Sequence, residues 1–139
     1  MAIPLADFIS FVTDHPLGVV ATVNADRGPQ SALVTFASCE DGDIVFDTQV
    51  GSRKVTNLTA DPRIALVIGT SEESSIQVEG TASLPRDAAE QRAWAQAYEA
   101  RFPDSQADDA AFTMVRVRPH WLRHYIVGGC LHEGAVDWA

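Results

Sequence analysis

Apolar residues in the N-terminal half of the chain recur first at helical spacing and then in short β-rich runs. The helical spacing comes from Leu5, Phe8, Ile9 and Val12. It predicts an amphipathic helix that ends before Pro16. Three runs rich in β-branched and apolar residues follow, at positions 18–24, 29–38 and 44–48. Turn-forming residues at 25–28 and 40–43 separate these runs, so the pattern predicts an antiparallel meander.

The rest of the chain alternates between helical and strand patterns. Helices are expected at 52–60 and 87–101, the second opened by Asp87 and Glu90 in a capping-box pattern. Strands are expected at 63–69, 75–83, 112–118 and 121–127, and the tail from Gly128 shows no periodicity. Short connections and the absence of a second domain boundary favour one domain over residues 1–139. The expected fold is a six- or seven-stranded antiparallel β-barrel with helices at its ends.

Composition and charge narrow the possible functions. An apolar content of 46% over 139 residues predicts a folded globular domain. The formal net charge of -9 repels phosphodiester backbones and anionic lipids, which argues against nucleic-acid and membrane-surface roles. Cys39 and Cys130 form no close-spaced pair, and there is no signal peptide or membrane-spanning apolar run. A reducing cytoplasmic location is therefore expected.

Arg53 and Lys54 stand at the start of the helix expected at 52–60, and Lys54 is the only lysine in the chain. Ser52 suits the N-cap position, where its hydroxyl can accept hydrogen bonds from the free amides of the first helical turn. Cations at a helix start oppose the helix dipole, whereas an anion there is stabilised. The pattern predicts an anion or phosphate site. The alternative is two basic side chains on a solvated surface.

A longer motif surrounds these cations: Phe46-Asp-Thr-Gln-Val-Gly-Ser-Arg-Lys54, followed by Leu58, Asp61-Pro62, Ala65-Leu66-Val67 and Val78-Glu79-Gly80. With it the chain resembles the pyridoxamine 5'-phosphate oxidase-like, FMN-binding split-barrel superfamily. The resemblance implies a Greek-key split barrel with flanking helices, and FMN as the cofactor. It also implies a homodimer with a cofactor site at each side of the interface.

The resemblance assigns cofactor contacts to specific positions. Arg53 and Lys54 match the residues that bind the FMN phosphate. The family often covers the flavin with an aromatic from the partner subunit, and the resemblance implies this role for Trp121, with packing in the core as the alternative. The strand along the flavin is matched by Ser31, Ala32, Leu33, Val34 and Thr35. The other contacts implied in the same site are Asp47, Thr48 and Ser52. Gln77 lies on the strand face of Ser75, where the oxidases carry glutamine, and is expected to replace that amide.

Other positions depart from the true oxidases. Alanine stands at position 32 where they carry arginine, and residues 128–139 contain no arginine of their Arg-x-His substrate motif. Pyridoxal phosphate synthesis is therefore not expected. Tyr98, Arg101 and Ser105 resemble the substrate-phosphate residues of the family. The alternative is that Tyr98 and Arg101 face outward from a helix.

The predicted function is an FMN-dependent oxidoreductase that transfers hydride to or from a small substrate of unknown identity. A bound flavin would explain why no acid–base pair or nucleophile elbow is evident, and no catalytic residue is assigned. His120 and His124 would share one face of a strand, but no third ligand accompanies them and a metal site is not predicted. The alternatives are a reductase that uses the deazaflavin coenzyme F-420, or a non-catalytic flavin- or haem-binding or stress-response protein.

Overall fold

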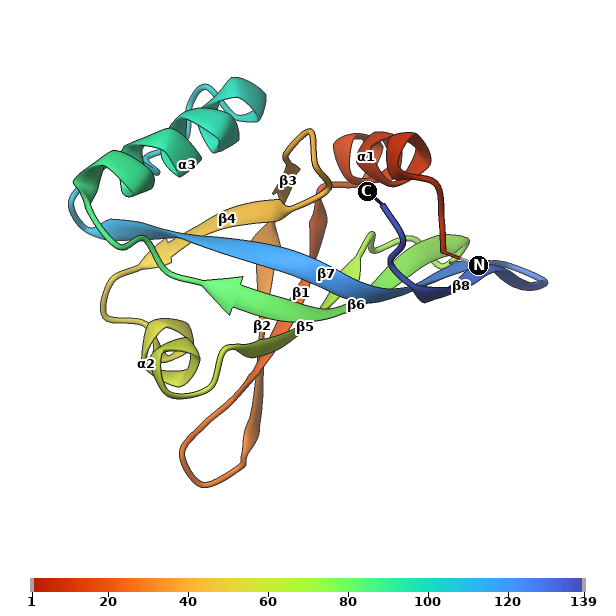
Figure 1. Ribbon diagram of the computed structural model, residues 1–139, viewed down its shortest axis with the longest axis horizontal. Coiled ribbons are helices and arrows are strands. Elements are labelled where there is room, and N and C mark those ends of the chain that lie inside the picture. Colours follow the sequence, from red (N-terminus) through yellow and green to blue (C-terminus); the bar gives the residue numbers. More distant parts are fainter. Residues whose placement is uncertain (1, 139) are drawn as a thin grey trace.

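The protein folds into a curled antiparallel sheet with three helices packed against it (Figure 1). The computed structural model describes residues 2–138. The helices are α1 (Leu5–Asp14), α2 (Arg53–Ala60) and α3 (Ala88–Arg101). The strands are β1 (Leu17–Val23), β2 (Pro29–Thr35), β3 (Ala37–Ser38), β4 (Ile44–Gln49), β5 (Arg63–Ile68), β6 (Ser74–Ser83), β7 (Phe112–Ile126) and β8 (Gly129–Ala135).

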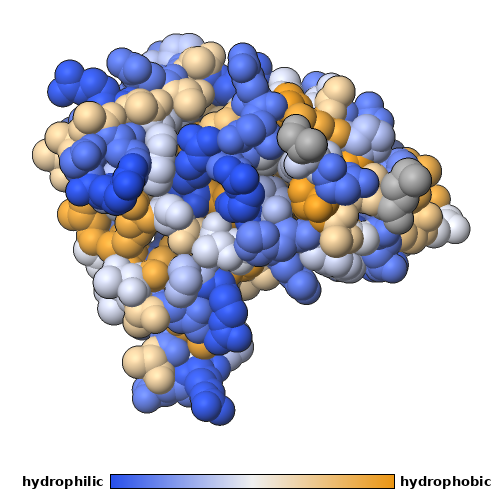
Figure 2. All heavy atoms as spheres, viewed as in Figure 1, coloured by the Kyte–Doolittle hydropathy of each residue, from blue (hydrophilic) through white to orange (hydrophobic). Residues whose placement is uncertain are grey.

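The strand order is β2-β1-β5-β6-β7-β4-β3, and β8 pairs with the C-terminal part of β7. In Figure 1, β1 and β2 cross behind β6 and β7 at a steep angle, so the sheet curls into an incomplete barrel. This confirms the predicted split barrel. The β1–β2 hairpin projects from the body, and Figure 2 shows hydrophilic residues at its tip. None of the helices in the described region is long and apolar enough to cross a membrane.

The two faces of the sheet differ in burial. Directly paired residues point to the same face, and the row Ala32, Val20, Leu66, Val78 and Leu122 faces the barrel interior. All of these except Ala32 are at most 2% exposed. The neighbouring row is Leu33, Val19, Val67, Gln77 and Arg123, and it faces outward. Leu33 is 63% exposed and Val67 is 40% exposed, so the outer face presents an uncovered apolar surface.

The helices close different parts of this barrel. The N-terminal helix α1 buries Phe8 and Val12, and Trp138 packs on Phe8 with ring centroids 5.0 Å apart. Helix α3 packs against β4 and β7 and buries Trp94, Ala95 and Tyr98. Its predicted cap is confirmed, since the Asp87 carboxylate accepts a hydrogen bond from the Glu90 amide at 2.8 Å. In Figure 1, α2 lies on the opposite side of β4 from α3.

The strand count of six or seven was too low, because the C-terminal region is more regular than its sequence indicates. The two strands expected at 112–118 and 121–127 are one strand, β7, which continues past Pro119 because the register shifts beside Gly80. The tail expected to be irregular forms β8 after a turn at Gly128 and Gly129, both with positive φ. Conversely, the single strand expected at 29–38 is divided into β2 and β3 at Phe36.

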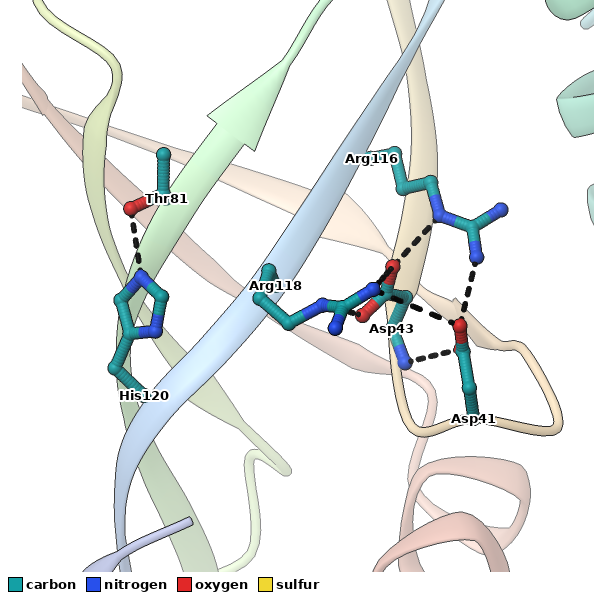
Figure 3. A network of polar contacts seen from close by, with 6 residues as sticks. All are labelled: Asp41, Asp43, Thr81, Arg116, Arg118 and His120. Carbon is teal, nitrogen blue, oxygen red and sulfur yellow. Dashed lines mark hydrogen bonds and ion pairs between the residues drawn. The ribbon is translucent and has the colours of Figure 1, made fainter. Parts of the chain in front are cut away.

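Ion pairs among four charged side chains connect the β3–β4 turn to β7 (Figure 3). The Arg116 Nε donates to Asp43 Oδ2 at 2.7 Å, and its terminal nitrogen donates to Asp41 Oδ2 at 3.1 Å. Arg118 lies 2.6 Å from Asp43 Oδ1 through its Nε. Asp43 is 3% exposed, so the two arginines compensate a carboxylate that is shielded from water.

Candidate anion-binding site

A pocket of about 260 Å³ lies between α2 and the end of the sheet formed by β1 and β2. Its wall contains two cationic side chains, Arg53 and Lys54, from the first turn of α2. The strands contribute Val20, Thr22, Gln30, Ser31 and Ala32. No carboxylate lines it, although the chain carries 19 acidic and 10 basic side chains. The local charge is therefore positive in a protein of negative net charge.

Both cations are available to a ligand. Within residues 2–138, neither Arg53 nor Lys54 forms an ion pair or a side-chain hydrogen bond. The first turn of α2 contains no acidic residue that would offset them. The helix dipole makes two unpaired cations unfavourable at the start of α2. An anion bound in the pocket would offset this unfavourable interaction.

Ser52 occupies the predicted N-cap position but does not cap the helix with its side chain. Its hydroxyl is hydrogen-bonded to the Thr48 hydroxyl at 2.9 Å instead. The prediction of a side-chain cap was wrong because a neighbouring hydroxyl on β4 competes for Ser52. The amides of the first turn consequently have no side-chain acceptor at Ser52.

The floor of the pocket contains a buried polar network that the sequence analysis missed. Asn57 Nδ2 donates to Thr22 Oγ1 at 2.9 Å and to Gln30 Oε1 at 2.7 Å. Thr22 is 2% exposed and Asn57 is 5% exposed. A signal was present, because Asn57 stands on the face of an eight-residue helix that also buries Leu58, where an asparagine requires hydrogen-bond partners.

The expected flavin-facing strand, β2, alternates between two faces. Ala32 and Val34 point inward and are partly buried, whereas Ser31 and Leu33 point outward and are exposed. Of these four, only Ser31 and Ala32 line the pocket with the cations. The residues assigned here by resemblance therefore do not share one surface.

The next pair, Asp47 and Thr48, is also divided between two sides of β4. Thr48 is buried on the side of α2, where it meets Ser52. Asp47 is directed toward α3 and is hydrogen-bonded to Tyr98. Burial raises the pKa of the Asp47 carboxyl, and the Tyr98 hydrogen bond opposes that shift. Neither residue lines the pocket, so Asp47 belongs to the packing of α3 in the described chain.

Gln77 and Trp121 lie on the outer face, in rows that begin at Leu33 and Ser31 on β2. Gln77 is three strands from β2 and Trp121 is four, which corresponds to roughly 14 and 19 Å at normal strand spacing. Neither Gln77 nor Trp121 lines the pocket of Arg53 and Lys54.

The expected substrate residues are placed around the far end of α3. Tyr98 is 5% exposed, so the alternative that it faces solvent is wrong. Burial and the neighbouring Asp47 raise the pKa of Tyr98 to about 12. Arg101 is exposed and donates to the Thr13 carbonyl at 3.4 Å, and the Ser105 hydroxyl is buried without a partner in residues 2–138. None of the three lines the pocket of Arg53 and Lys54.

His120 and His124 do not share a face, contrary to expectation. His120 is exposed and contacts the Thr81 hydroxyl at 2.7 Å (Figure 3). His124 is buried beneath α1 and contacts the Ser74 hydroxyl at 3.1 Å. The register shift beside Gly80 inserts one residue between them and reverses the alternation. Among residues 2–138, no group of three or more His, Cys, Asp or Glu side chains is arranged to hold a metal.

Together these features describe a split β-barrel with a cationic pocket at the start of a helix. Residues 6–125 match the sequence profile described as "Pyridoxamine 5'-phosphate oxidase", which is most of the chain. The chain therefore belongs to the pyridoxamine 5'-phosphate oxidase family.

The chain is similar in sequence to one curated protein over a short segment, and similar in fold to solved structures over most of its length. A pyridoxine/pyridoxamine 5'-phosphate oxidase of Rubrobacter xylanophilus is 37% identical over 65 residues, which are 46% of this chain and 30% of that protein. The match thus spans less than a third of that relative. A putative pyridoxamine 5'-phosphate oxidase from Listeria innocua superposes with a TM-score of 0.71 at 19% identity, covering 86% of this chain and 96% of the other. An F420 reductase superposes with a TM-score of 0.64 at 23% identity, covering 81% and 93%.

Proposed function

We propose that this protein binds FMN, with the cofactor phosphate in the pocket between α2 and β2. The main support is the pair of cations, Arg53 and Lys54, which have no partner in the described chain and face a wall without carboxylates. A phosphate dianion would gain charge-assisted hydrogen bonds from both. Membership of the family favours FMN as the molecule that brings this phosphate.

The rest of the cofactor needs a surface outside the pocket. A volume of about 260 Å³ is below the range of roughly 300–1,000 Å³ typical of small-molecule sites, so it suits a phosphate and part of its chain. The exposed Leu33 adjoins Ser31 and Ala32 of the pocket wall and offers an apolar surface to a ring.

We propose a homodimer in which the second copy covers that surface. Leu17, Leu33 and Val67 are all at least 40% exposed on the outer face, and a protein–protein contact would remove them from water. Gln77 and Trp121 lie on this same face. In a dimer they would reach the cofactor of the partner, which reconciles their expected role with their distance from the pocket of their own chain.

The proposed activity is oxidoreduction of a small substrate. A bound flavin supplies the hydride chemistry, and the protein holds the cofactor, orients it and excludes water. Arg53 and Lys54 would anchor the phosphate, and Leu33 with the partner's apolar face would shield the ring. The unpaired Cys39 and Cys130 agree with a reducing, cytoplasmic setting, which is part of this proposal.

The test is the visible spectrum and FMN affinity of the purified protein. The wild type should bind FMN, and Arg53→Ala or Lys54→Ala should weaken binding about tenfold or more, because each removes a charge-assisted hydrogen bond. Arg86→Ala is the matched control, since Arg86 is exposed and paired with Glu90 outside the pocket. Unchanged FMN affinity in both pocket variants would refute the phosphate assignment.

A second measurement separates an enzyme from a binding protein. Bound FMN should be reduced by a nicotinamide donor and reoxidised by an acceptor if the protein is an oxidoreductase. Persistent failure of reduction by physiological donors would support a non-catalytic flavin-binding role. Uptake of coenzyme F-420 in preference to FMN would support the deazaflavin alternative, for which the fold of the F420 reductase is the precedent. A Soret band would indicate haem.

A further inference from the structure

A buried histidine continues an apolar row on the sheet beneath α1. His124 on β7 pairs directly with Ile76 on β6 and with His132 on β8, so these three side chains point to one face. Ile76 is fully buried and His124 is only 9% exposed. The Phe11 ring of α1 meets the His124 ring edge-on, with centroids 5.2 Å apart. His124 therefore places an ionisable group inside the contact between α1 and the sheet.

The hydrogen bonding of His124 suits a neutral ring better than a charged one. Its Nε2 lies 3.1 Å from the Ser74 hydroxyl, and its Nδ1 is buried without a hydrogen-bond partner in residues 2–138. A neutral imidazole leaves one nitrogen unsatisfied here, whereas the protonated ring carries two N–H donors and a charge. A buried donor and a buried charge both cost free energy when nothing pairs with them.

The neighbouring strands offer no negative charge to a protonated ring. On β8, the His132 ring is stacked on His124 with centroids 6.5 Å apart, so protonation of both rings would bring two positive charges together. Glu133 is paired with Arg123 in a different cross-strand row. On β6, the group in contact is the neutral Ser74 hydroxyl. The strands thus favour neutral His124.

Helix α1 supplies carboxylates near the ring, but none in contact with it. Asp7, Asp14 and His15 line a pocket of about 280 Å³ together with His124 and His132. No carboxylate forms an ion pair with His124 in the described chain. Burial and then His132 hold the pKa of His124 below its ordinary value of 6.5, and the Asp7 carboxylate opposes that shift.

The stability of α1 as an isolated helix is small, so the helix depends on its contacts with the sheet. It has 10 residues, and isolated helices shorter than about 12–15 residues are marginal in water. Its N-cap residue is Pro4, which makes no side-chain cap hydrogen bond. Packing of Phe8 and Val12 holds it in place. Detaching α1 is therefore a direct way to return a protonated His124 to water.

We propose that acid detaches α1 from the sheet, through protonation of His124 against His132 and Phe11. None of these three residues lines the pocket of Arg53 and Lys54, so the inference is independent of FMN binding. Above neutral pH the ring is neutral and α1 stays on the sheet. Below the ordinary histidine pKa of 6.5, the detached form takes up a proton that the packed form resists. The detached population therefore grows as the pH falls.

Amide hydrogen exchange measures the detached population. Protection factors in α1, corrected for the intrinsic exchange rate, should fall about three- to thirtyfold from pH 7.5 to pH 5. The upper figure is the limit for one histidine that titrates normally when α1 is detached and stays neutral when it is packed. At both pH values α1 should be less protected than the central strand β5, because α1 opens without global unfolding. Equal protection of α1 and β5 at pH 5 would contradict the proposal.

Two substitutions of His124 remove the titrating group in different ways. His124→Phe keeps an aromatic ring against Phe11, and His124→Gln keeps a polar group that can bond to the Ser74 hydroxyl. In both variants the protection of α1 should become nearly independent of pH between 7.5 and 5. His120→Gln is the matched control, since His120 is an exposed histidine of β7, and it should keep the wild-type pH response. Thermal unfolding at pH 7.5 checks that each variant is folded.

Two neighbours of His124 should change the acid response in opposite directions. His132→Asn removes the repelling ring, so the fall in α1 protection between pH 7.5 and pH 5 should become at least about twofold smaller. Asp7→Asn removes the carboxylate that opposes the shift, so the fall should become larger. A merely structural role of these side chains would change protection equally at the two pH values.

The imidazole signals of His124 in an NMR titration provide a direct readout. The titration midpoint should lie below the ordinary histidine pKa of 6.5. A midpoint at or above 6.5, or a wild-type pH response in both His124 variants, would overturn the proposal. The measurements are repeated at tenfold lower protein concentration, and a pH response of α1 that changes with dilution would assign it to assembly and would also overturn the proposal.

Discussion

Within the described residues, the cationic side chains on one side of β4 are paired with carboxylates, whereas those on the other side have no partner. On the side covered by α3, the cations Arg116 and Arg118 are paired with Asp41 and Asp43, and the Arg116 guanidinium also lies 5.9 Å from the Trp94 ring. On the side of α2, Arg53 and Lys54 have no partner within residues 2–138. Arg53 and Lys54 are adjacent in the sequence, whereas Arg116 and Arg118 are two positions apart on one face of β7.

This contrast separates structural cations from binding cations. A cation whose charge is compensated within the fold contributes to stability, since its removal leaves a shielded carboxylate unpaired. A cation left uncompensated at a helix start does not stabilise the fold, since it opposes the helix dipole, and it is available to an external anion. Substitutions on the α3 side are therefore expected to change stability, and those on the α2 side to change ligand affinity.

The greatest change is expected in the stability of Asp43→Ala. Asp43 is 3% exposed and bridges both arginines, so its removal leaves two guanidinium groups without their main partner. Because Arg118 is largely exposed, we expect a loss near the lower end of the range for broken buried pairs, about 3 kcal/mol, or about 10 °C in Tm. Urea unfolding measures it, with Asp26→Ala at the exposed hairpin as the control. A loss below about 1 kcal/mol would mean that the network does not hold β4 to β7.

A matched pair of substitutions tests the contrast between the two sides directly. Arg116→Met should cost about 1–2 kcal/mol of stability and leave FMN affinity unchanged. Arg53→Met should weaken FMN binding about tenfold and leave stability within about 0.5 kcal/mol, or raise it slightly, because a cation is removed from a helix start. Both variants lose one arginine, so the overall charge change is the same. The opposite result, with Arg53→Met destabilising and Arg116→Met weakening binding, would reverse the assignment of the two sides.

Much of the fold could be predicted from the sequence because hydrophobic period and turn residues specify local structure. The three helices and the strands up to Ser83 were expected within a few residues of their observed bounds, except that the strand expected at 29–38 is divided into β2 and β3. The C-terminal errors have a local cause. Pro119 suggests a strand break, and the two glycines of β8, Gly129 and Gly134, obscure its period. The register shift beside Gly80 and the pairing of β8 with β7 decide the outcome instead.

The candidate site was predictable in part. The cations were found because their position before an apolar helical stretch has a physical meaning in sequence. Asp47 and Thr48 were expected together, but adjacent strand residues point to opposite sides, so one meets α3 and the other meets α2. The Asn57 network was missed because it joins residues 27 and 35 positions apart, and only the tertiary structure brings them together.

The weakest effect is expected at Tyr98, whose hydroxyl contacts Asp47 on the α3 side. Burial raises the pKa of Tyr98 to about 12, above its ordinary value of 10.0. A raised folded-state pKa gives stability that is complete below pH 10 and is lost as the pH rises toward 12, because the unfolded chain releases the proton first. At pH 11 this lost stability is about 1 kcal/mol.

Tyr98→Phe isolates that contribution. At pH 8 the variant should be less stable than the wild type by about 1 kcal/mol, because Asp47 loses a hydrogen-bond donor. Between pH 10 and pH 11 the wild type should lose stability relative to the variant, so that the two curves converge. Urea unfolding at both pH values measures the difference. If the two stability curves stay parallel between pH 10 and pH 11, folding does not raise the pKa of Tyr98. The α3 side would then hold a titratable group that its packing does not control, and the contrast with the open α2 side would be limited to the arginines.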